Sequence, residues 1–253
     1  MRLLVLVFVF LGLLGCNSGG GGGGHSFGQG KVVTTPLSSE QKASFVLLLG
    51  SHGRAQNAYM RLGYPKDKST DETEMKMYEL LLGAGCKYEK VPKKTGDTYI
   101  VEESIASSGC PVNYFQHIEA TETKAIVSQK YLALTDVYKM LNDVVGITLD
   151  AESRIAGRNA AAEGTGKISS KAYGELPYYI FGTIQSTEDG KNGKIRTGLG
   201  VQMPFGLVQI VGTTTTVDGK TTAEIEINGE KIDKSTSPEL IPFRKLLARY
   251  LLF

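Results

Sequence analysis

Tryptophan is absent from this sequence, and cysteine and histidine are scarce, with three of each among 253 residues. So few histidines and cysteines give no spacing typical of a zinc site, and we predict no metal and no cofactor. Lysine and arginine total 28 against 26 for aspartate and glutamate, which leaves a net charge of +2. The two signs are interspersed without a basic stripe, so nucleic acid is not an expected partner. The lack of tryptophan also argues against a sugar-binding platform.

Four short segments each match part of a catalytic or nucleotide-binding motif, and in each case the rest of the motif is missing. Ser39–Lys42 and Lys94–Gly96 have the S-x-x-K and K-T-G patterns of serine β-lactamases, but the S-D-N element is missing and the interval is too short. Gly164–Lys167 resembles the end of a phosphate loop, but the first glycine and the final serine or threonine of that motif are absent. We interpret it as a glycine turn between two strands. Gly198–Gly200 lies within a strand pattern and has no dinucleotide-binding context.

The remaining candidate acids and bases are isolated along the sequence. His52 and His117 are the only histidines after the first 30 residues, and we interpret both as structural. Glu224 and Glu226 alternate with apolar residues, so we expect them on a solvated strand face. We therefore predict no catalytic residue. An envelope hydrolase with scattered active-site residues is kept as an alternative.

The N-terminus carries the pattern of a cleaved signal sequence. Arg2 provides a positive charge, and the apolar run Leu3–Leu14 is about a dozen residues long, whereas a membrane-spanning helix needs about 20. The segment Leu13-Leu14-Gly15-Cys16 that follows resembles the lipobox of bacterial lipoproteins. The resemblance implies a signal peptide over residues 1–15 and a mature chain that begins with a lipidated Cys16. Apart from this covalent lipid on Cys16, we predict no cofactor. Two or three acyl chains anchor a protein stably in a membrane.

The residues after the cysteine predict a cellular location and a flexible tether. In the best-known sorting rule of bacterial lipoproteins, aspartate directly after the lipidated cysteine retains the protein at the inner membrane. This chain has Asn17 at that position, so the resemblance implies the outer membrane. It leaves open whether the protein lies on the periplasmic or the surface side. Gly19–Gly24 is an unbroken glycine run, which has much backbone entropy and nothing to bury. We expect residues 16–36 to form a flexible tether that spans roughly 25 Å.

Cys86 and Cys110 are the two other cysteines. Exported proteins enter an oxidising compartment, so the pair predicts a disulfide, with two free buried thiols as the alternative. Glycines and a proline flank both residues, which places them near turns. Closing a loop of this size stabilises a fold by about 3 kcal/mol in the chain-entropy model.

Helical spacing of apolar residues occurs in four places. Ser38 and Gln41 fit a capping box, and a helix follows from about Ser39 to Leu62. Met75–Leu82 can be drawn as a strand or a short helix, and we favour the helix. Apolar residues after Thr135 or Asp136 predict a middle helix that ends at Gly146, with Val144 and Val145 in its stripe. A last helix opens at Pro238 or Pro242 and ends the chain.

Alternating apolar and polar residues predict a series of strands. Asp218–Gly219 separates two such runs and is typical of a type I′ hairpin turn. Its register places Val208, Ile210, Ile225 and Ile227 on one face. The other expected strands cover about Tyr88–Val91, Thr98–Val101, Val112–Lys130 (as one strand or two), Ile147–Ile155, Lys167–Gly174, Pro177–Ser186, Lys194–Met203 and Gly206–Val217.

Together these elements predict a single β-rich α+β domain over residues 37–253, built on a curved antiparallel sheet or partial barrel. We expect an N-terminal, a middle and a C-terminal helix. Two aromatic segments are candidates for ligand binding: alternation places Tyr178 on one strand face and Tyr179 and Phe181 on the other, and Phe205 lies in an apolar turn.

The sequence thus predicts a lipid-anchored, non-catalytic envelope protein. We expect it to bind an envelope partner or an apolar ligand through its curved sheet, beside the membrane that holds its lipid. A structural or surface-display lipoprotein is the first alternative to this function.

Overall fold

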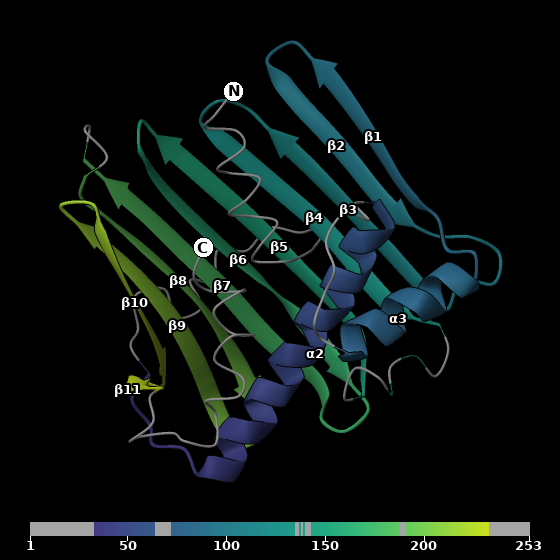
Figure 1. The fold of residues 1–253 in the computed structure, drawn as a ribbon, viewed down its shortest axis with the longest axis horizontal. Coiled ribbons are helices and arrows are strands. Elements are labelled where there is room, and N and C mark those ends of the chain that lie inside the picture. The colour runs from purple at the N-terminus through teal and green to yellow at the C-terminus, as the bar shows by residue number, and fades with distance from the viewer. Residues whose placement is uncertain are drawn as a thin grey trace.

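The structure is a computed structural model that describes residues 33–63, 72–134, 137, 139, 143–187 and 191–232. Two helices, α2 (Ser39–Gly63) and α3 (Glu72–Gly83), precede eleven strands that form one open antiparallel sheet. The sheet curves, and both helices lie across the same side of it (Figure 1). The predicted signal peptide, Cys16 and most of the predicted tether lie outside the described residues.

Each strand pairs with the strand that follows it in the chain, so the spatial order is the sequence order, from β1 to β11. This is the arrangement that consecutive hairpins produce. The strands are β1 (Tyr88–Thr95), β2 (Thr98–Ile105), β3 (Val112–Ala120), β4 (Lys124–Ala133), β5 (Val144–Ala156), β6 (Asn159–Ser170), β7 (Gly174–Ser186), β8 (Gly193–Met203), β9 (Gly206–Val217), β10 (Lys220–Ile227) and β11 (Glu230–Lys231).

The start of α2 has the capping box that the sequence predicts. The backbone N–H of Gln41 donates to the Ser38 Oγ at 3.2 Å, and the Gln41 Oε1 accepts from the Ser38 N–H at 2.9 Å. These two bonds satisfy N–H groups that have no partner inside the first helical turn. The predicted bounds of this helix are confirmed within one residue, and the preferred helical interpretation of Met75–Leu82 is confirmed by α3.

One side of the sheet packs against the helices, and we call it the covered face. Its buried side chains alternate along every long strand, and they form one core with the buried side of α2 and α3. The other side is called the outer face. The α2 residues of this core include Phe45, Val46, Leu48, Leu49, Ala58 and Tyr59. The strand residues of the covered face include Val101, Ile105, Tyr114, Ile118, Val127, Tyr131, Ile147, Leu149, Ile168, Leu176, Tyr178, Ile180, Val201, Met203, Val208, Ile210, Ile225 and Ile227.

The segment interpreted as a glycine turn, Gly164–Lys167, lies instead inside β6. A Cβ atom on Gly166 would overlap the carbonyl oxygen of Thr148 on β5, and one on Gly164 would overlap the Asp150 carbonyl. Glycine is needed here because β5 and β6 approach one another closely on the covered face. The small residues at the start of β6 lack the β-branched side chains typical of strands, which is why the predicted strand begins eight residues late.

The hairpin at Asp218–Gly219 is confirmed. Both residues have positive φ, 49° and 77°, as a type I′ turn requires, and Val217 pairs with Lys220. Ile227 pairs directly with Ile210, so the predicted apolar face is part of the core.

Some predicted boundaries are wrong. Val144 and Val145, placed in the middle helix from their spacing, begin strand β5, and most of that helix lies outside the described residues. The run Val112–Lys130 forms two strands, because Thr121–Thr123 turns the chain and pairs β3 with β4. The predicted C-terminal helix also lies outside the described part of the chain.

Candidate functional site

A row of polar side chains crosses the covered face beneath the helices. Lys90, Glu103, Gln116 and Gln129 are direct cross-strand partners on β1, β2, β3 and β4. The Lys90 Nζ lies 2.6 Å from the Glu103 Oε1, and the Gln116 Nε2 donates to the Glu103 Oε2 at 3.1 Å. The Gln129 Nε2 donates to the Gln116 Oε1 at 3.2 Å. We call these four residues the polar row.

Three of the four residues of the polar row are buried, although one of them is the charged Glu103. Glu103, Gln116 and Gln129 are 4%, 7% and 4% exposed. Carboxylates and amides this deeply buried destabilise a fold unless their hydrogen bonds are made, and here each bonds to the next residue of the row. Lys90 balances the charge of Glu103 at the edge strand. The row is therefore an electrically neutral band of hydrogen-bonding groups in an apolar core.

Three tyrosines extend this polar region toward α2. The Tyr59 ring on α2 packs against the rings of Tyr114 and Tyr131, with centroids 5.5 and 5.4 Å away. The Tyr114 hydroxyl accepts a hydrogen bond from the Gln129 Nε2 at 2.7 Å. By contrast, the buried hydroxyls of Tyr59 and Tyr131 have no hydrogen-bond partner outside their own pair, and we call them unpartnered in that sense. Two phenolic groups are thus buried without a hydrogen bond to the polar row or to any other group of the core.

Both unpartnered hydroxyls remain protonated at neutral pH. Burial raises the pKa of Tyr59 well above its ordinary value of 10.0, and the neighbouring Tyr131 adds to the effect. Burial raises the pKa of Tyr131 to about 12, although the Tyr59 hydroxyl partly opposes it. Each group is therefore available as an O–H donor. A ligand oxygen placed between Tyr59 and Tyr131 would meet two donors.

The helices that cover this region are attached to the sheet at opposite ends. At the start of α2, the Lys42 Nζ lies 2.7 Å from the Glu230 Oε2 on β11. At the other end of the helix, the Arg61 Nε lies 2.8 Å from the Glu74 Oε1, which joins α2 to α3. Lys42 and Glu74 are both largely buried. The two helices therefore form a cover that spans the sheet from β11 towards β1.

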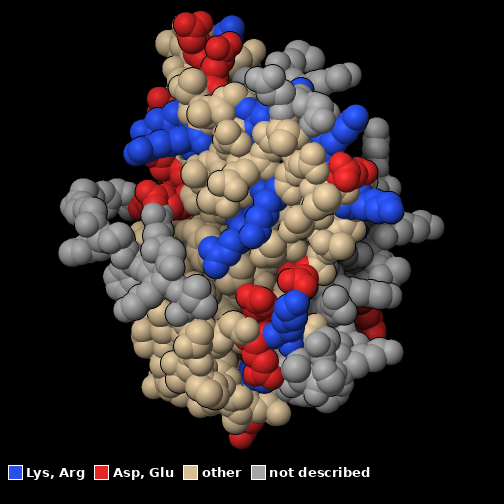
Figure 2. Space-filling model, turned by 90° about the vertical axis from the view of Figure 1, so that its left-hand side faces the viewer, with Lys and Arg blue, Asp and Glu red and all other residues tan. Residues whose placement is uncertain are grey.

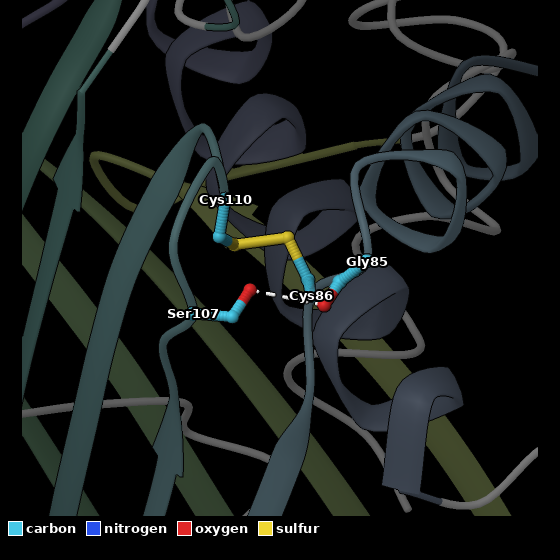
Figure 3. The surroundings of a disulfide bond; sticks show 4 residues. All are labelled: Gly85, Cys86, Ser107 and Cys110. Carbon is cyan, nitrogen blue, oxygen red and sulfur yellow. Dashed lines mark hydrogen bonds between the residues drawn. A yellow bond between two sulfur atoms is a disulfide. The ribbon is translucent and has the colours of Figure 1, made fainter.

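The predicted disulfide between Cys86 and Cys110 is present, with the Cα atoms 5.0 Å apart. It joins the loop after α3 to the turn between β2 and β3 (Figure 3). Beside it, the Ser107 hydroxyl donates to the Gly85 carbonyl at 2.9 Å (Figure 3). The alternative of two free thiols is wrong in this structure. The bond fixes the α3 end of the cover.

The four aromatic candidates for ligand binding do not form one site. Tyr178 lies on the covered face within the core, whereas Tyr179 and Phe181 lie on the outer face, as alternation predicts. Phe205 lies in the two-residue turn between β8 and β9 and is 37% exposed. The aromatic pair of the outer face packs with Val211, and the ring centroids of Tyr179 and Phe181 are 6.3 Å apart.

Two glycines explain how this outer aromatic pair fits the sheet. A Cβ atom on Gly198 would overlap the Phe181 ring, and one on Gly200 would overlap the Tyr179 ring. The Arg196 guanidinium lies 4.9 Å from the centre of the Phe181 ring. The rings therefore lie flat across β8, and the pattern Gly198–Gly200 has a packing role rather than a nucleotide-binding one.

A hollow of about 720 Å³ is formed at the ends of β5 to β8. Ile155, Ala160 and Ile184 contribute to its lining, and all three adjoin the main core. Polar residues at its border include Asn192 and Gln185. Its volume lies within the range of small-molecule sites.

The acidic and basic candidates are placed as structural groups. The His117 Nδ1 lies 3.4 Å from the Glu102 Oε1 on the outer face, and Glu224 pairs with Lys231 at 2.5 Å. Among the described residues, no three histidine, cysteine or acidic side chains gather as a metal site would require. On the side that contains β10 and β11, basic and acidic side chains are interspersed (Figure 2). The side chain of His52 lies outside what the structure describes.

The polar row was missed from the sequence although a signal for it exists. Glu103, Gln116 and Gln129 each stand at the centre of an alternating run, between apolar residues two positions away on both sides. A polar residue at the middle of a buried strand face is the pattern that identifies such a row. Only the register of β2, β3 and β4 brings the three side chains together.

No protein-family model, curated protein or solved structure matches this chain. Within the described residues, neither helix has the length and apolar character needed to cross a membrane.

Proposed function

We propose that this protein is a lipid-anchored, non-catalytic protein of the bacterial cell envelope that binds an amphiphilic ligand between the covered face of its sheet and helices α2 and α3. The lipobox pattern that ends at Cys16, and Asn17 after it, support an outer-membrane anchor. The glycine-rich residues that follow support a body held near the membrane by a flexible tether.

The observation that carries the ligand proposal is the pair of unpartnered hydroxyls beside the polar row. A buried hydroxyl without a hydrogen bond costs about 1–3 kcal/mol, so two of them, on Tyr59 and Tyr131, are a substantial cost for an apolar core. A ligand with an acceptor oxygen, such as a carbonyl or a hydroxyl, recovers that loss. The surrounding apolar residues of α2 and the sheet suit its hydrocarbon part.

The attachment of the helices supports reversible access to this region. The Lys42–Glu230 ion pair has one partner that is 40% exposed, so it opens to water at modest cost, whereas the Cys86–Cys110 bond is covalent. We therefore propose that a ligand enters at the α2 start, where the attachment is non-covalent, rather than at the disulfide-bonded α3 end.

Organic extraction tests the proposal. The full mature chain with Cys16→Ser, which carries no covalent acyl group, is recovered without detergent and extracted, and bound amphiphiles are identified by mass spectrometry. We expect one amphiphile class in near-stoichiometric amount, and less of it with the double variant Tyr59→Phe/Tyr131→Phe. Tyr173→Phe, on an exposed turn, is the matched control. A clean extract, together with no rise in the unfolding temperature when a fatty acid or lysophospholipid is added, would overturn the ligand proposal.

A structural role is the second candidate, and one observation favours it. The side chains of α2 and the covered face form a continuous core in which Phe45, Ile105 and Ile180 are almost fully buried. A core packed in this way suits a rigid spacer on the tether. Negative results in the extraction and in a pull-down from envelope fractions favour this role. A hydrolase is tested separately, by replacing His117 and Glu226 in turn in any activity found.

A further inference from the structure

The chain that leads to α2 is attached to one particular end of the sheet. The Asn228 Nδ2 donates to the Thr35 carbonyl at 2.9 Å, and the Val33 N–H lies 3.5 Å from the Gln209 Oε1. Gln209 and Asn228 are themselves buried and paired, since the Gln209 N–H donates to the Asn228 Oδ1 at 2.7 Å. The segment that connects the body to Cys16 therefore leaves from the turn between β10 and β11.

Several other turns lie at this same end. In a sheet whose strands follow chain order, every second turn is at the same end, so the turns after β2, β4, β6, β8 and β10 lie together. We call this the tether end. The Asn228 Nδ2 also lies 3.5 Å from the Leu207 carbonyl, which places the turn after β8 directly beside the tether. In Figure 1 the start of α2 lies at this end as well.

The turns of the tether end carry exposed large apolar residues. Leu134 follows β4 and is 55% exposed, while Tyr173 before β7 and Phe205 after β8 are each 37% exposed. The described turns at the opposite end consist of glycine, threonine and charged residues, namely Gly96–Asp97, Thr121–Thr123, Gly157–Arg158 and Asp218–Gly219. The turns themselves therefore differ between the two ends, while at the opposite end the exposed large apolar residues are strand residues beside the turns, namely Tyr99 (42%) and Val217 (56%).

We propose that the tether end is a membrane-contact surface, on which Leu134, Tyr173 and Phe205 insert into the interface of the bilayer that holds the lipid anchor. This inference rests on the lipid anchor of the proposed function. Aromatic side chains prefer the membrane–water interface, where the ring is partly buried and polar groups stay hydrated.

The length of the tether supports a bilayer as the occupant. Val33 stands 17 positions after Cys16, and a glycine-rich chain of that length would span roughly 20–25 Å root-mean-square. Of the described body, the tether end is the part that the fewest residues separate from Cys16. With the apolar turns inserted, the strands stand away from the bilayer and the charged turns face the aqueous side.

The absence of tryptophan provides a direct test. Phe205→Trp and Tyr173→Trp each introduce a single fluorescent reporter at the tether end, and Phe115→Trp introduces one in mid-strand on the outer face. Phe115 is 43% exposed, so the reporters start from similar exposure. The lipidated full chain is bound to vesicles of phosphatidylethanolamine and phosphatidylglycerol whose acyl chains are brominated. We expect a blue shift and loss of emission for the first two reporters and neither change for Phe115→Trp.

Flotation with the vesicles separates the possible failures. Lipidated chain that floats, while none of the reporters is quenched, overturns the membrane-contact surface and leaves the anchor intact. Equal quenching of all three reporters also overturns it, because the body then has no preferred orientation. Lipidated chain that does not float overturns the anchor and this inference together. Two reporters are placed at the tether end so that the result does not depend on one variant that fails to fold.

Discussion

The Nζ of Lys42, in the first turn of α2, lies 2.7 Å from the Oε2 of Glu230 on β11. The two residues are 188 positions apart in the sequence, so this ion pair joins the first described helix to the last described strand. It holds the start of the cover against the edge of the sheet. The other end of the cover is held by the covalent Cys86–Cys110 bond, which is stronger than this ion pair.

Glu230→Gln is expected to loosen the start of α2 without unfolding the domain. The change removes one charge-assisted hydrogen bond from a partly exposed pair, so we expect a loss of about 1 kcal/mol in the free energy of unfolding. Amide hydrogen exchange should increase over the first turns of α2 and remain unchanged in β5 to β7. Glu72→Gln, which breaks the exposed Lys76–Glu72 pair, is the control and should change nothing measurable.

Removing both unpartnered hydroxyls is expected to stabilise the ligand-free protein. The double variant Tyr59→Phe/Tyr131→Phe takes away two buried hydroxyls that bond to no group outside their own pair, so it should raise the free energy of unfolding by about 1 kcal/mol, and neither single variant should lower it by more than that. For a domain of this size that is about 2–4 °C in the unfolding temperature. Tyr114→Phe should have the opposite effect, because the Gln129 Nε2 loses an acceptor. Calorimetry in which the double variant is destabilised as Tyr114→Phe is would contradict the assignment of unpartnered hydroxyls.

The same tyrosines predict instability at alkaline pH. A tyrosine whose pKa is raised in the folded state loses its proton more readily when unfolded, so ionisation favours the unfolded chain. The pKa of Tyr131 rises from 10.0 to about 12, so stability should be complete below pH 10 and decrease between pH 10 and about 12. The full effect of Tyr131 is about 3 kcal/mol. Urea titrations at several pH values should show a shallower decline for Tyr131→Phe and an unchanged one for Tyr173→Phe.

Loss of the Cys86–Cys110 bond is expected to lower stability by about 3 kcal/mol, because it closes a loop with a sequence separation of 24 residues. The double variant Cys86→Ser/Cys110→Ser should unfold at lower urea concentration and exchange amide hydrogens faster in α3. A reducing agent should have the same effect on the unaltered chain and none on the double variant. Identical midpoints with and without reductant would show that the bond contributes little.

Gly166→Ala is expected to be strongly destabilising. The new methyl group would overlap the Thr148 carbonyl and the backbone of Leu149, which cannot move aside without separating β5 from β6. Overpacking of this kind costs about 3 kcal/mol. Gly83→Ala is the matched control, since a Cβ there meets nothing within 4 Å. Urea unfolding of the two variants should therefore differ clearly in midpoint, and similar midpoints would contradict the close approach of β5 and β6.

Local patterns predicted the hairpins and the first helix well. The capping box at Ser38 and Gln41, and the positive-φ turn at Asp218–Gly219, involve residues adjacent in the chain, so neighbouring sequence determines them. The alternation at Tyr178–Phe181 correctly separated the two faces of β7. The disulfide was predicted from compartment and composition.

What could not be predicted depends on contacts across the sheet. Gly164 and Gly166 are glycines because a different strand approaches them, so their own neighbours suggest a turn. Likewise, Gln116 and Gln129 look like ordinary polar strand residues until their register joins them in one row. For the same reason, a stripe of apolar residues at Val144 suggested a helix where the pairing with β6 makes a strand.

The chain-order pairing of all eleven strands has a consequence for how the protein reaches its native state. Each strand finds its partner a few residues away, so the sheet can assemble progressively, as hairpins added one after another. Docking of α2 is different, because its contacts with Glu230 depend on the last strand being in place. A newly synthesised chain therefore completes its core only when the whole meander is present, and docking of the helix is the last step of folding.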